Sequence, residues 1–347
     1  MPKYARIFLL LFLQHHGLVR AFSATPPPPP PTPPSPPPKD DINRKDWTDA
    51  LSSQFDLGKT NALSSNTSTS TVSRRDVFHW PFLAAGSAVV TGELLAVAVA
   101  GTGLSRPPAH EQRVADIVRR SLVAAAETAS ATSKTTLKVL EVGMGSDIRL
   151  IRRGLYNQGI AKIASNNNSI KSLEITGVDL NVPKGNNRKD AEMLLDRLGA
   201  TTGLKSTLKI QQGSVTERLP FDDGSFDAVI CCLTLCSVTD PVAALQEMKR
   251  LVRPSGGTFG YIEHVAVNPD EPYRFLEWQQ TNLDSLQQLV ADNCHLHRYT
   301  QETIHQVFQN EYASGSDQSK TIFEDRFLVD KMWPVTSQAC GVLQRGA

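Results

Sequence analysis

A nearly unbroken apolar run at Asp227–Leu235 constrains the fold more than any other feature of this sequence. It reads Asp-Ala-Val-Ile-Cys-Cys-Leu-Thr-Leu, with no alternation of apolar and polar residues. A strand of this composition is buried on both faces, as in parallel sheets that carry helices on both sides. We therefore expect an α/β fold in which this run is one of the strands.

Strand and helix signals alternate on both sides of that run, which predicts parallel strands joined by helices. The expected strands are Leu137–Val142, Glu174–Val178, Leu208–Gln211, Asp227–Leu235 and Thr258–Ile262. The expected helices are Val114–Glu127, Asp147–Gln158, Asp190–Leu198 and Pro241–Leu251. The domain formed by these elements is expected to cover residues 110–347.

The chain before this domain has the composition of targeting signals and linkers. Residues 1–24 resemble a signal peptide, with an apolar run at Ile7–Leu13 followed by small residues. Pro26–Pro38 is almost all proline, which favours a stiff, solvated spacer. The whole stretch 25–72 is rich in Pro, Ser and Thr and has too little apolar surface to fold. We expect a disordered N-terminal region.

A second targeting signal is expected at residues 73–101. There Arg74-Arg75 precedes an apolar stretch, as in a twin-arginine export signal. The alternative is a membrane anchor at 77–100, although Glu93 within a bilayer would cost about 2.5–3.5 kcal/mol. The order of the segments, with Phe22 near the first cleavage point, is similar to plastid presequences of algae with secondary plastids. That resemblance implies a plastid protein, with association to the thylakoid as one form of that location. The alternative is the secretory pathway or the endoplasmic reticulum membrane.

Charge and cysteine content exclude several classes of partner. The chain carries 36 basic and 35 acidic side chains without a basic run, so we expect no nucleic-acid partner. Its five cysteines are odd in number and have neither disulfide-framework nor zinc-site spacing. We therefore predict reduced, buried thiols and no metal site.

A glycine loop after the first expected strand indicates a ligand site, because open α/β sheets bind ligands at strand ends. Gly143, Met144 and Gly145 would let a ligand approach the backbone, and the following helix would offer free N–H groups. A dinucleotide loop needs a small residue where Ile148 stands. Glu141 suits a ligand with an ammonium and a carboxylate, such as the methionine end of S-adenosylmethionine. The alternative is a tight turn without a ligand.

Further candidates for the same site follow the next strands. Asp179, at the end of the second strand, could accept hydrogen bonds from two ribose hydroxyls, or could instead cap a helix. The other expected cofactor-binding residues are Leu180, Ser214, Val215 and Cys232, although packing is the favoured role of Cys232.

Four motifs occur in order across residues 137–262. They are Glu-x-Gly-x-Gly, the acid ending the second strand, Leu-Pro-Phe-x-Asp-x-Ser-Phe-Asp at 219–227 and Val-Arg-Pro-x-Gly-Gly at 252–257. Together they resemble class I S-adenosylmethionine-dependent methyltransferases of the type 11 group. The resemblance implies a Rossmann-like, seven-stranded, mostly parallel sheet with helices on both faces, and S-adenosylmethionine as cofactor. An NAD-linked oxidoreductase stays a minor alternative.

Narrower motifs resemble the membrane-associated small-thiol methyltransferases, and more distantly the quinone C-methyltransferases. They lie at Cys232–Val238, Glu263–Val265, Trp278–Gln280 and Asn293–Arg298. Two positions depart from the family pattern: Asp147 replaces the third glycine, and Ser214 replaces the acid that commonly holds the adenine amino group. These departures predict weaker cofactor binding, and a non-catalytic homologue stays open.

The resemblance implies in-line methyl transfer to a small molecule, by S-, O- or C-methylation, without a metal and by a monomer. A thiol acceptor is already partly thiolate near neutral pH, so a base is optional. His264 is the candidate base or orienting group, or else a histidine satisfied by backbone. Cys294 and His297 are candidates for the acceptor pocket. We expect Phe275, Leu276 and Trp278 to form a core-packed helix over that pocket.

Overall fold

The computed structural model describes residues 106–166, 169–183, 185–309, 319–330 and 332–346. The expectations for residues 1–24, 25–72 and 73–101 lie outside these ranges. Within them, no helix combines the length and the apolar character needed to cross a bilayer.

The described residues form one seven-stranded sheet, which confirms the predicted fold class. Its strands are β1 (Thr136–Val142), β2 (Ser172–Asp179), β3 (Lys205–Gln212), β4 (Ala228–Cys232), β5 (Thr258–His264), β6 (Lys320–Leu328) and β7 (Ser337–Gln344). Their order across the sheet is β3-β2-β1-β4-β5-β7-β6. Strands β1 to β5 are parallel, whereas β7 runs antiparallel to both β5 and β6. The carboxyl ends of the five parallel strands therefore meet at one edge.

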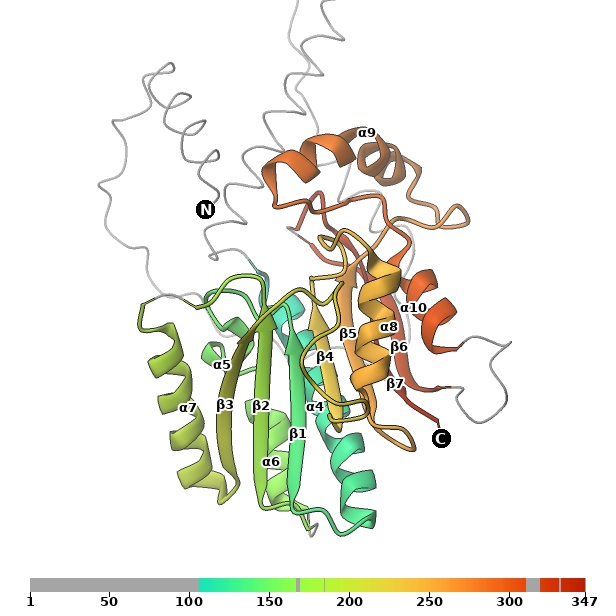
Figure 1. Ribbon diagram of the computed structural model, residues 1–347. Coiled ribbons are helices and arrows are strands. Elements are labelled where there is room, and N and C mark those ends of the chain that lie inside the picture. The colour runs from blue at the N-terminus through green and yellow to red at the C-terminus, as the bar shows by residue number, and fades with distance from the viewer. Residues whose placement is uncertain (1–105, 167–168, 184, 310–318, 331, 347) are drawn as a thin grey trace, which may run out of the picture. The chain divides into compact units, whose positions relative to one another are not determined.

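Helices cover both faces of the sheet (Figure 1). The helices are α4 (Pro108–Ala131), α5 (Arg149–Arg152), α6 (Asn157–Ser165), α7 (Asn187–Thr202), α8 (Pro241–Leu251), α9 (Arg274–Val290) and α10 (Thr300–Phe308). Apolar residues of α4, α6 and α7 pack in one core cluster, and those of α8 and α10 pack in a second. Strand β4 is buried along its whole length, as expected for a strand between two helical layers.

Two expected elements differ from the structure. In place of one helix at 147–158 there are the short α5 and the separate α6, because Gly154 adopts a positive φ of +70° between them. The expected strand to Leu235 ends at Cys232, since the next residue, Leu233, turns the chain with a φ of +52°. The apolar composition predicted buried residues correctly in both segments. It did not predict the backbone turns at Gly154 and Leu233.

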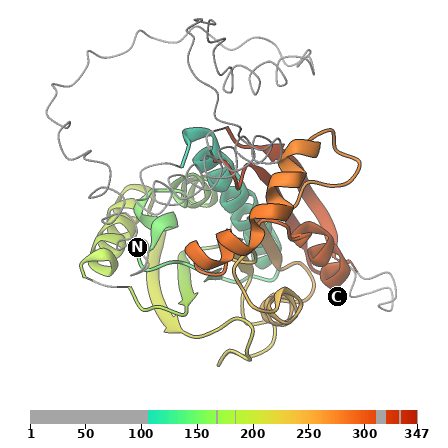
Figure 2. The same ribbon diagram turned by 90° about the horizontal axis from the view of Figure 1, so that it is seen from above.

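Helix α9 lies at the end of the molecule where the parallel strands finish (Figures 1 and 2). Gln280 ties it to the segment after β5, accepting from the Val267 N–H at 2.8 Å and donating to the Val265 carbonyl at 3.1 Å. The prediction that Phe275 and Trp278 pack in the core is wrong: their exposed fractions are 63% and 53%. The two rings stack on each other at the surface of the helix instead.

Asp227 shows that part of the sequence motif serves the fold rather than the site. Its buried carboxylate pairs with Lys134 at 2.8 Å and with Arg253 at 2.7 Å, and it accepts from the Lys138 N–H at 3.0 Å. All these contacts lie at the amino end of β4, away from the edge where the glycine loop lies. Asp227 therefore joins β1, β4 and the turn after α8.

Candidate functional site

A cavity of about 360 Å³ opens at the carboxyl ends of β1 to β4. Small-molecule pockets in proteins are typically about 300–1,000 Å³. Of the predicted cofactor residues, the lining includes Gly143, Asp179, Leu180, Ser214 and Val215. The lining residues that the sequence did not single out as candidates are Val142, Val178, Asn181, Gly213, Thr216, Leu233, Thr234, Ser237, Val238, Thr239 and Asp292. Several of these follow β4, in or next to the family-like motif at 232–238, but of that motif only Cys232 was a predicted cofactor residue.

The glycine loop has the backbone geometry that close ligand approach requires. Gly143 and Gly145 have φ values of +71° and +72°. A Cβ at Gly143 would lie 2.0 Å from Thr234 Oγ1, so no larger residue fits there. Asp179 then fixes the loop, because its Oδ2 accepts from the Gly145 N–H at 3.0 Å and its Oδ1 from the Asn181 N–H at 2.8 Å. Asp179 thus joins the ends of β1 and β2 and caps no helix.

Glu141 is a buried carboxyl with an unused oxygen. The Tyr156 hydroxyl donates to its Oε2 at 2.9 Å, and its Oε1 has no hydrogen-bond partner among the described residues. Burial, opposed by the Tyr156 hydrogen bond and reinforced by Asp147 and Asp179, raises its pKa to about 8. A buried acceptor without a donor marks a missing ligand group or water. An ammonium would supply both a donor and a compensating charge, so this residue fits the methionine end of S-adenosylmethionine.

The residues after β3 form the other side of the cavity. Ser214 accepts from the Thr216 N–H at 3.3 Å, and the hydroxyls of the two residues lie 2.7 Å apart. The Val215 side chain is buried against Leu219 and Val178 in the second core cluster. A hydroxyl that bonds to its neighbour is a weaker acceptor than a carboxylate, which agrees with the expectation of modest affinity on this side.

Asp147, the residue in place of the third glycine, is exposed. It caps no helix, because α5 begins after Ile148 and has no side-chain cap. The helix that was expected to follow the glycine loop and offer its N-terminal N–H groups is only the four-residue α5. Burial is the main cause of the raised pKa values of Glu141 and Glu111, and the negative charge of Asp147 adds to both shifts.

The other predicted cofactor residues, Glu141, Met144, Gly145 and Cys232, do not line the cavity. Met144 is buried against Gly177, where an added Cβ would lie 2.0 Å from its sulfur. Cys232 belongs to the core cluster, and burial raises the pKa of its thiol to about 12. A thiol that stays protonated suits packing better than nucleophilic chemistry.

The segment after β4 closes the cavity, and Arg298 holds it in place. The Arg298 guanidinium donates to the Leu235 carbonyl at 2.6 Å and to the Val238 carbonyl at 2.9 Å. Asn293 donates to the Ser237 carbonyl at 3.0 Å. The two family-like motifs at 232–238 and 293–298 are therefore in contact through these hydrogen bonds. The sequence alone did not indicate this contact.

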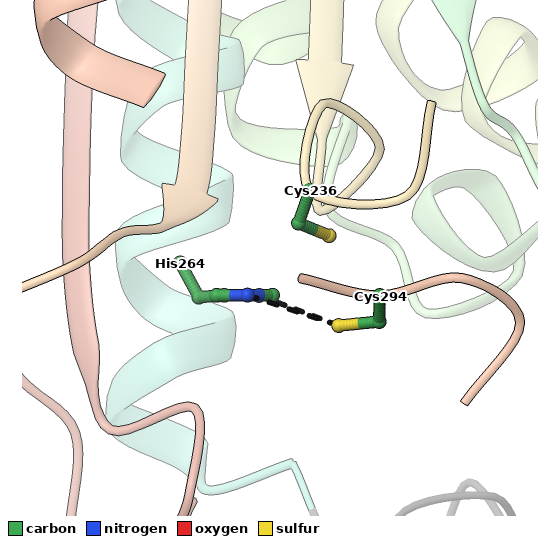
Figure 3. Close-up of side chains that lie close together, drawn as sticks. All are labelled: Cys236, His264 and Cys294. Carbon is green, nitrogen blue, oxygen red and sulfur yellow. Dashed lines mark hydrogen bonds between the residues drawn. The ribbon is translucent and has the colours of Figure 1, made fainter. Parts of the chain in front are cut away.

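His264 lies at the end of β5 with Cys236 and Cys294 beside it (Figure 3). Its Nε2 is 2.6 Å from the His295 carbonyl oxygen, and Cys294 Sγ lies 3.9 Å from Nδ1. Burial lowers the pKa of His264, but the Cys236 sulfur and the His295 carbonyl outweigh it and raise that pKa to about 9. His264 does not line the described cavity, and its backbone partner agrees with the alternative role of a satisfied histidine. Its role as a base stays a prediction.

Among the other acceptor-pocket candidates, Cys294 is buried and His297 is partly buried. The His297 ring packs edge-on against Tyr299, and its backbone N–H donates to Asp284 at 3.2 Å. Every cysteine is free and buried, as predicted.

Comparison with known proteins gives a family match within the sheet domain. Residues 159–259 match the methyltransferase domain family. Human thiol S-methyltransferase TMT1B is 44% identical over 78 residues, 22% of this chain and 30% of that protein. A demethylmenaquinone methyltransferase of Beutenbergia cavernae is 38% identical over 89 residues, 25% of this chain and 36% of that protein. The chain spans about a third of the length of these curated relatives.

Among solved structures, a SAM-dependent methyltransferase of Methanosarcina mazei aligns at 14% identity and a TM-score of 0.39. That alignment covers 61% of this chain and 93% of the other chain.

Proposed function

We propose that this chain, which carries a class I S-adenosylmethionine-dependent methyltransferase domain, methylates the sulfur of a small thiol. The observation that carries the methyltransferase part is the cavity at the strand ends, which Gly143 and Asp179 line, together with the unpartnered oxygen of Glu141 near the end of β1. The thiol part rests on the similarity to thiol S-methyltransferases over the matched segment.

Each cofactor contact has a residue suited to it. Glu141 would hold the ammonium of the methionine end, and the backbone around Gly143 would lie against the ligand. Asp179 would accept from the ribose hydroxyls, and Val215 with Ser214 would face the adenine. The cofactor, when bound, supplies an electrophilic methyl group on a sulfonium.

The protein's part in the reaction is then orientation and exclusion of water. Residues 233–234 and 237–239 and Asp292 line one side of the cavity, and Arg298 holds that segment in place. A thiol acceptor needs little help in losing its proton, because a free thiol has a pKa of about 8.5. The proposal therefore does not depend on His264 acting as a base.

A quinone or lipid-like acceptor is the second candidate. Relatives named as demethylmenaquinone and ubiquinone/menaquinone C-methyltransferases match at 38% and 35% identity, over a quarter of this chain. C-methylation of a quinol ring requires a base to remove the ring proton, whereas thiol methylation does not. Removal of a base should therefore affect the two reactions differently.

Labelled S-adenosylmethionine with a panel of small thiols, quinols and phenols tests the proposal. We expect label in a thioether product together with S-adenosylhomocysteine. Transfer to quinols alone would replace the thiol proposal by the second candidate. Calorimetric binding of the cofactor without any product would identify a non-catalytic homologue.

For the cell, we propose a monomeric protein located in the plastid, with the secretory pathway as the competing location. The support is the arrangement of residues 1–101 in the sequence. Light scattering of the purified protein gives its oligomeric state, and a fluorescent fusion to residues 1–101 gives its location.

A further inference from the structure

Three side chains from separate parts of the chain lie close together, at the segment 233–239 that follows β4. Cys236 follows β4, His264 ends β5, and Cys294 follows α9 (Figure 3). Their exposed fractions are 2%, 2% and 8%. One potential ligand atom from each lies within 4.8 Å of the other two. Because 28 and 30 residues separate them along the chain, no sequence spacing indicates this cluster.

The distances suit a tetrahedral metal ion. Zinc binds cysteine sulfur at about 2.3 Å and histidine nitrogen at about 2.0–2.1 Å, which places the two ligand atoms about 3.6 Å apart. Cys294 Sγ lies 3.7 Å from His264 Nε2 and 3.9 Å from Nδ1. Small side-chain adjustments would therefore complete the coordination.

The hydrogen bond of His264 fixes which nitrogen is available. Nε2 is 2.6 Å from the His295 carbonyl oxygen, which can only accept, so Nε2 carries the proton. A metal ion would therefore bind at Nδ1, which lies 3.9 Å from Cys294 Sγ. Histidines that bind metals nearly always donate their other N–H to a carboxylate, a backbone carbonyl or a water.

Gln287 provides an independent observation. Its exposed fraction is 4%, its Nε2 lies 3.7 Å from Cys294 Sγ, and its Oε1 has no partner among the described residues. The Gln287 amide thus lies against Cys294 with one polar atom unsatisfied, and a donor such as a metal-bound water next to Cys294 would satisfy it. The amide can also present either of its ends to that space.

The loops that carry the two cysteines are held rigidly enough to preform such a site. Arg298 binds the Leu235 carbonyl next to Cys236. Asp284 of α9 accepts from the Leu296 N–H at 2.6 Å, just after Cys294. A preformed set of ligands loses little conformational freedom when it binds an ion.

We infer that Cys236, His264 and Cys294 bind one zinc ion, with a fourth coordination position left open. Two thiolates and an imidazole are a donor set that soft or borderline metals such as zinc prefer. Three protein ligands with an open position are typical of catalytic rather than structural zinc sites. The inference goes beyond methyl transfer, because displacement at a sulfonium requires no metal.

Metal content of the full-length chain, purified under reducing conditions, tests the inference. We expect about one zinc per chain after incubation with zinc and desalting, and a thiolate-to-cobalt absorption band after replacement by Co²⁺. Cys236→Ala and Cys294→Ala should each lower zinc affinity by more than about a hundredfold, since loss of an outer hydrogen-bond partner alone costs about 10–100-fold. Cys340→Ala is the matched control, because Cys340 is an equally buried thiol of β7 outside the cluster.

Cofactor binding, measured by calorimetry on the same samples, separates this inference from the proposed function. Absence of zinc from the wild-type chain that binds S-adenosylmethionine would overturn the metal site alone. The same zinc content in all three variants would also overturn it. A Cys236–Cys294 disulfide that forms equally with and without zinc would overturn it as well, because a bound zinc ion should protect both thiols from oxidation. The wild-type measurement decides the question even if a variant fails to fold.

Discussion

Asp179 lines the cavity and connects the ends of β1 and β2. It is half-buried, and both of its oxygens accept backbone N–H groups, from Gly145 and Asn181. Asp179→Ala should weaken S-adenosylmethionine binding by about 10–150-fold, because charge-assisted hydrogen bonds contribute about 1.5–3 kcal/mol. Titration calorimetry measures this effect, with the exposed Asp196→Ala as control. Unchanged affinity in a folded Asp179→Ala protein would remove Asp179 from the site.

Glu141 predicts a pH dependence of cofactor binding. With a pKa of about 8, its carboxyl is mostly protonated in the free protein at neutral pH, but it must be ionised to hold an ammonium. The affinity should therefore rise between pH 6 and 7.5, by up to about tenfold per unit, while the cofactor's own amino group stays protonated. Glu141→Gln should bind more weakly with a flat profile. Parallel profiles for both proteins would contradict the assignment.

The stability of the free protein should follow the opposite trend. The pKa of Glu141 is higher in the folded chain than in the unfolded one, so the unfolded state releases its proton first. This contribution is fully present below about pH 4.5 and is lost as the pH rises towards about 8. Chemical denaturation of the wild type and of Glu141→Gln across this range isolates the contribution.

Asp147 places a negative charge where the cofactor brings its own carboxylate. Asp147→Gly should tighten binding by about two- to fivefold, a modest gain because the side chain is exposed and screened by solvent. Asp147→Asn, which removes the charge but keeps a side chain, should recover most of that gain in calorimetry. Weaker binding in both variants would mean that the carboxylate itself contacts the ligand.

At the scale of elements, the sequence predicts strands and long helices well and the segments between them poorly. The five predicted strands correspond to β1 to β5, and for β1, β2, β4 and β5 burial on both faces leaves a compositional signal. Strands β6 and β7 were not predicted individually; family resemblance alone supplied the count of seven. The break between α5 and α6 depends on one glycine φ, which composition does not report.

The candidate site shows the same contrast between local motifs, which the sequence predicts, and connecting segments, which it does not. Gly143 and Asp179, which sit in local motifs, were predicted and line the cavity, whereas the cofactor-binding role of Glu141 stays a prediction. Five residues of the segment after β4 line the cavity, and Arg298, about 60 residues later, holds that segment through the Leu235 and Val238 carbonyls. Long-range support of this kind is created by packing and leaves no periodic pattern.

The segment after β4 should therefore loosen when its support is removed. Arg298→Ala deletes donors to the Leu235 and Val238 carbonyls, so fewer molecules hold the closed conformation. Apparent cofactor affinity should fall by the same fraction, which we expect to be up to about tenfold. Hydrogen exchange should rise at residues 233–239. Arg274→Ala, an exposed arginine of α9 that pairs only with Glu277 in the described structure, should change neither.

At the scale of the whole molecule, the domain begins with α4, whose boundaries exceed the expected Val114–Glu127 by several residues at each end. One face of α4 packs into the first core cluster along Val114, Val118, Leu122 and Ala125. It also approaches β5 so closely that a Cβ on Gly260 would lie 2.2 Å from Ser121 Oγ. This helix therefore belongs to the fold rather than to the preceding linker.

The two possible starting points of the domain give the last prediction. A chain starting at Gly101 should be soluble and bind S-adenosylmethionine, because it keeps α4 and omits only the segments with linker or signal composition. A chain starting at Thr136 should aggregate or lose binding, since it exposes the apolar surface that α4 covers. Size-exclusion chromatography and calorimetry compare the two.

The contrary outcome is equally informative. If the Gly101 chain aggregates while the full chain is active in detergent, residues 77–100 act as a membrane anchor and the export-signal hypothesis fails. N-terminal sequencing of the protein from its native cell provides an independent decision. A start near Gly101 requires cleavage after the apolar stretch, whereas an intact Arg74-Arg75 pair would show that the segment is retained in the mature protein.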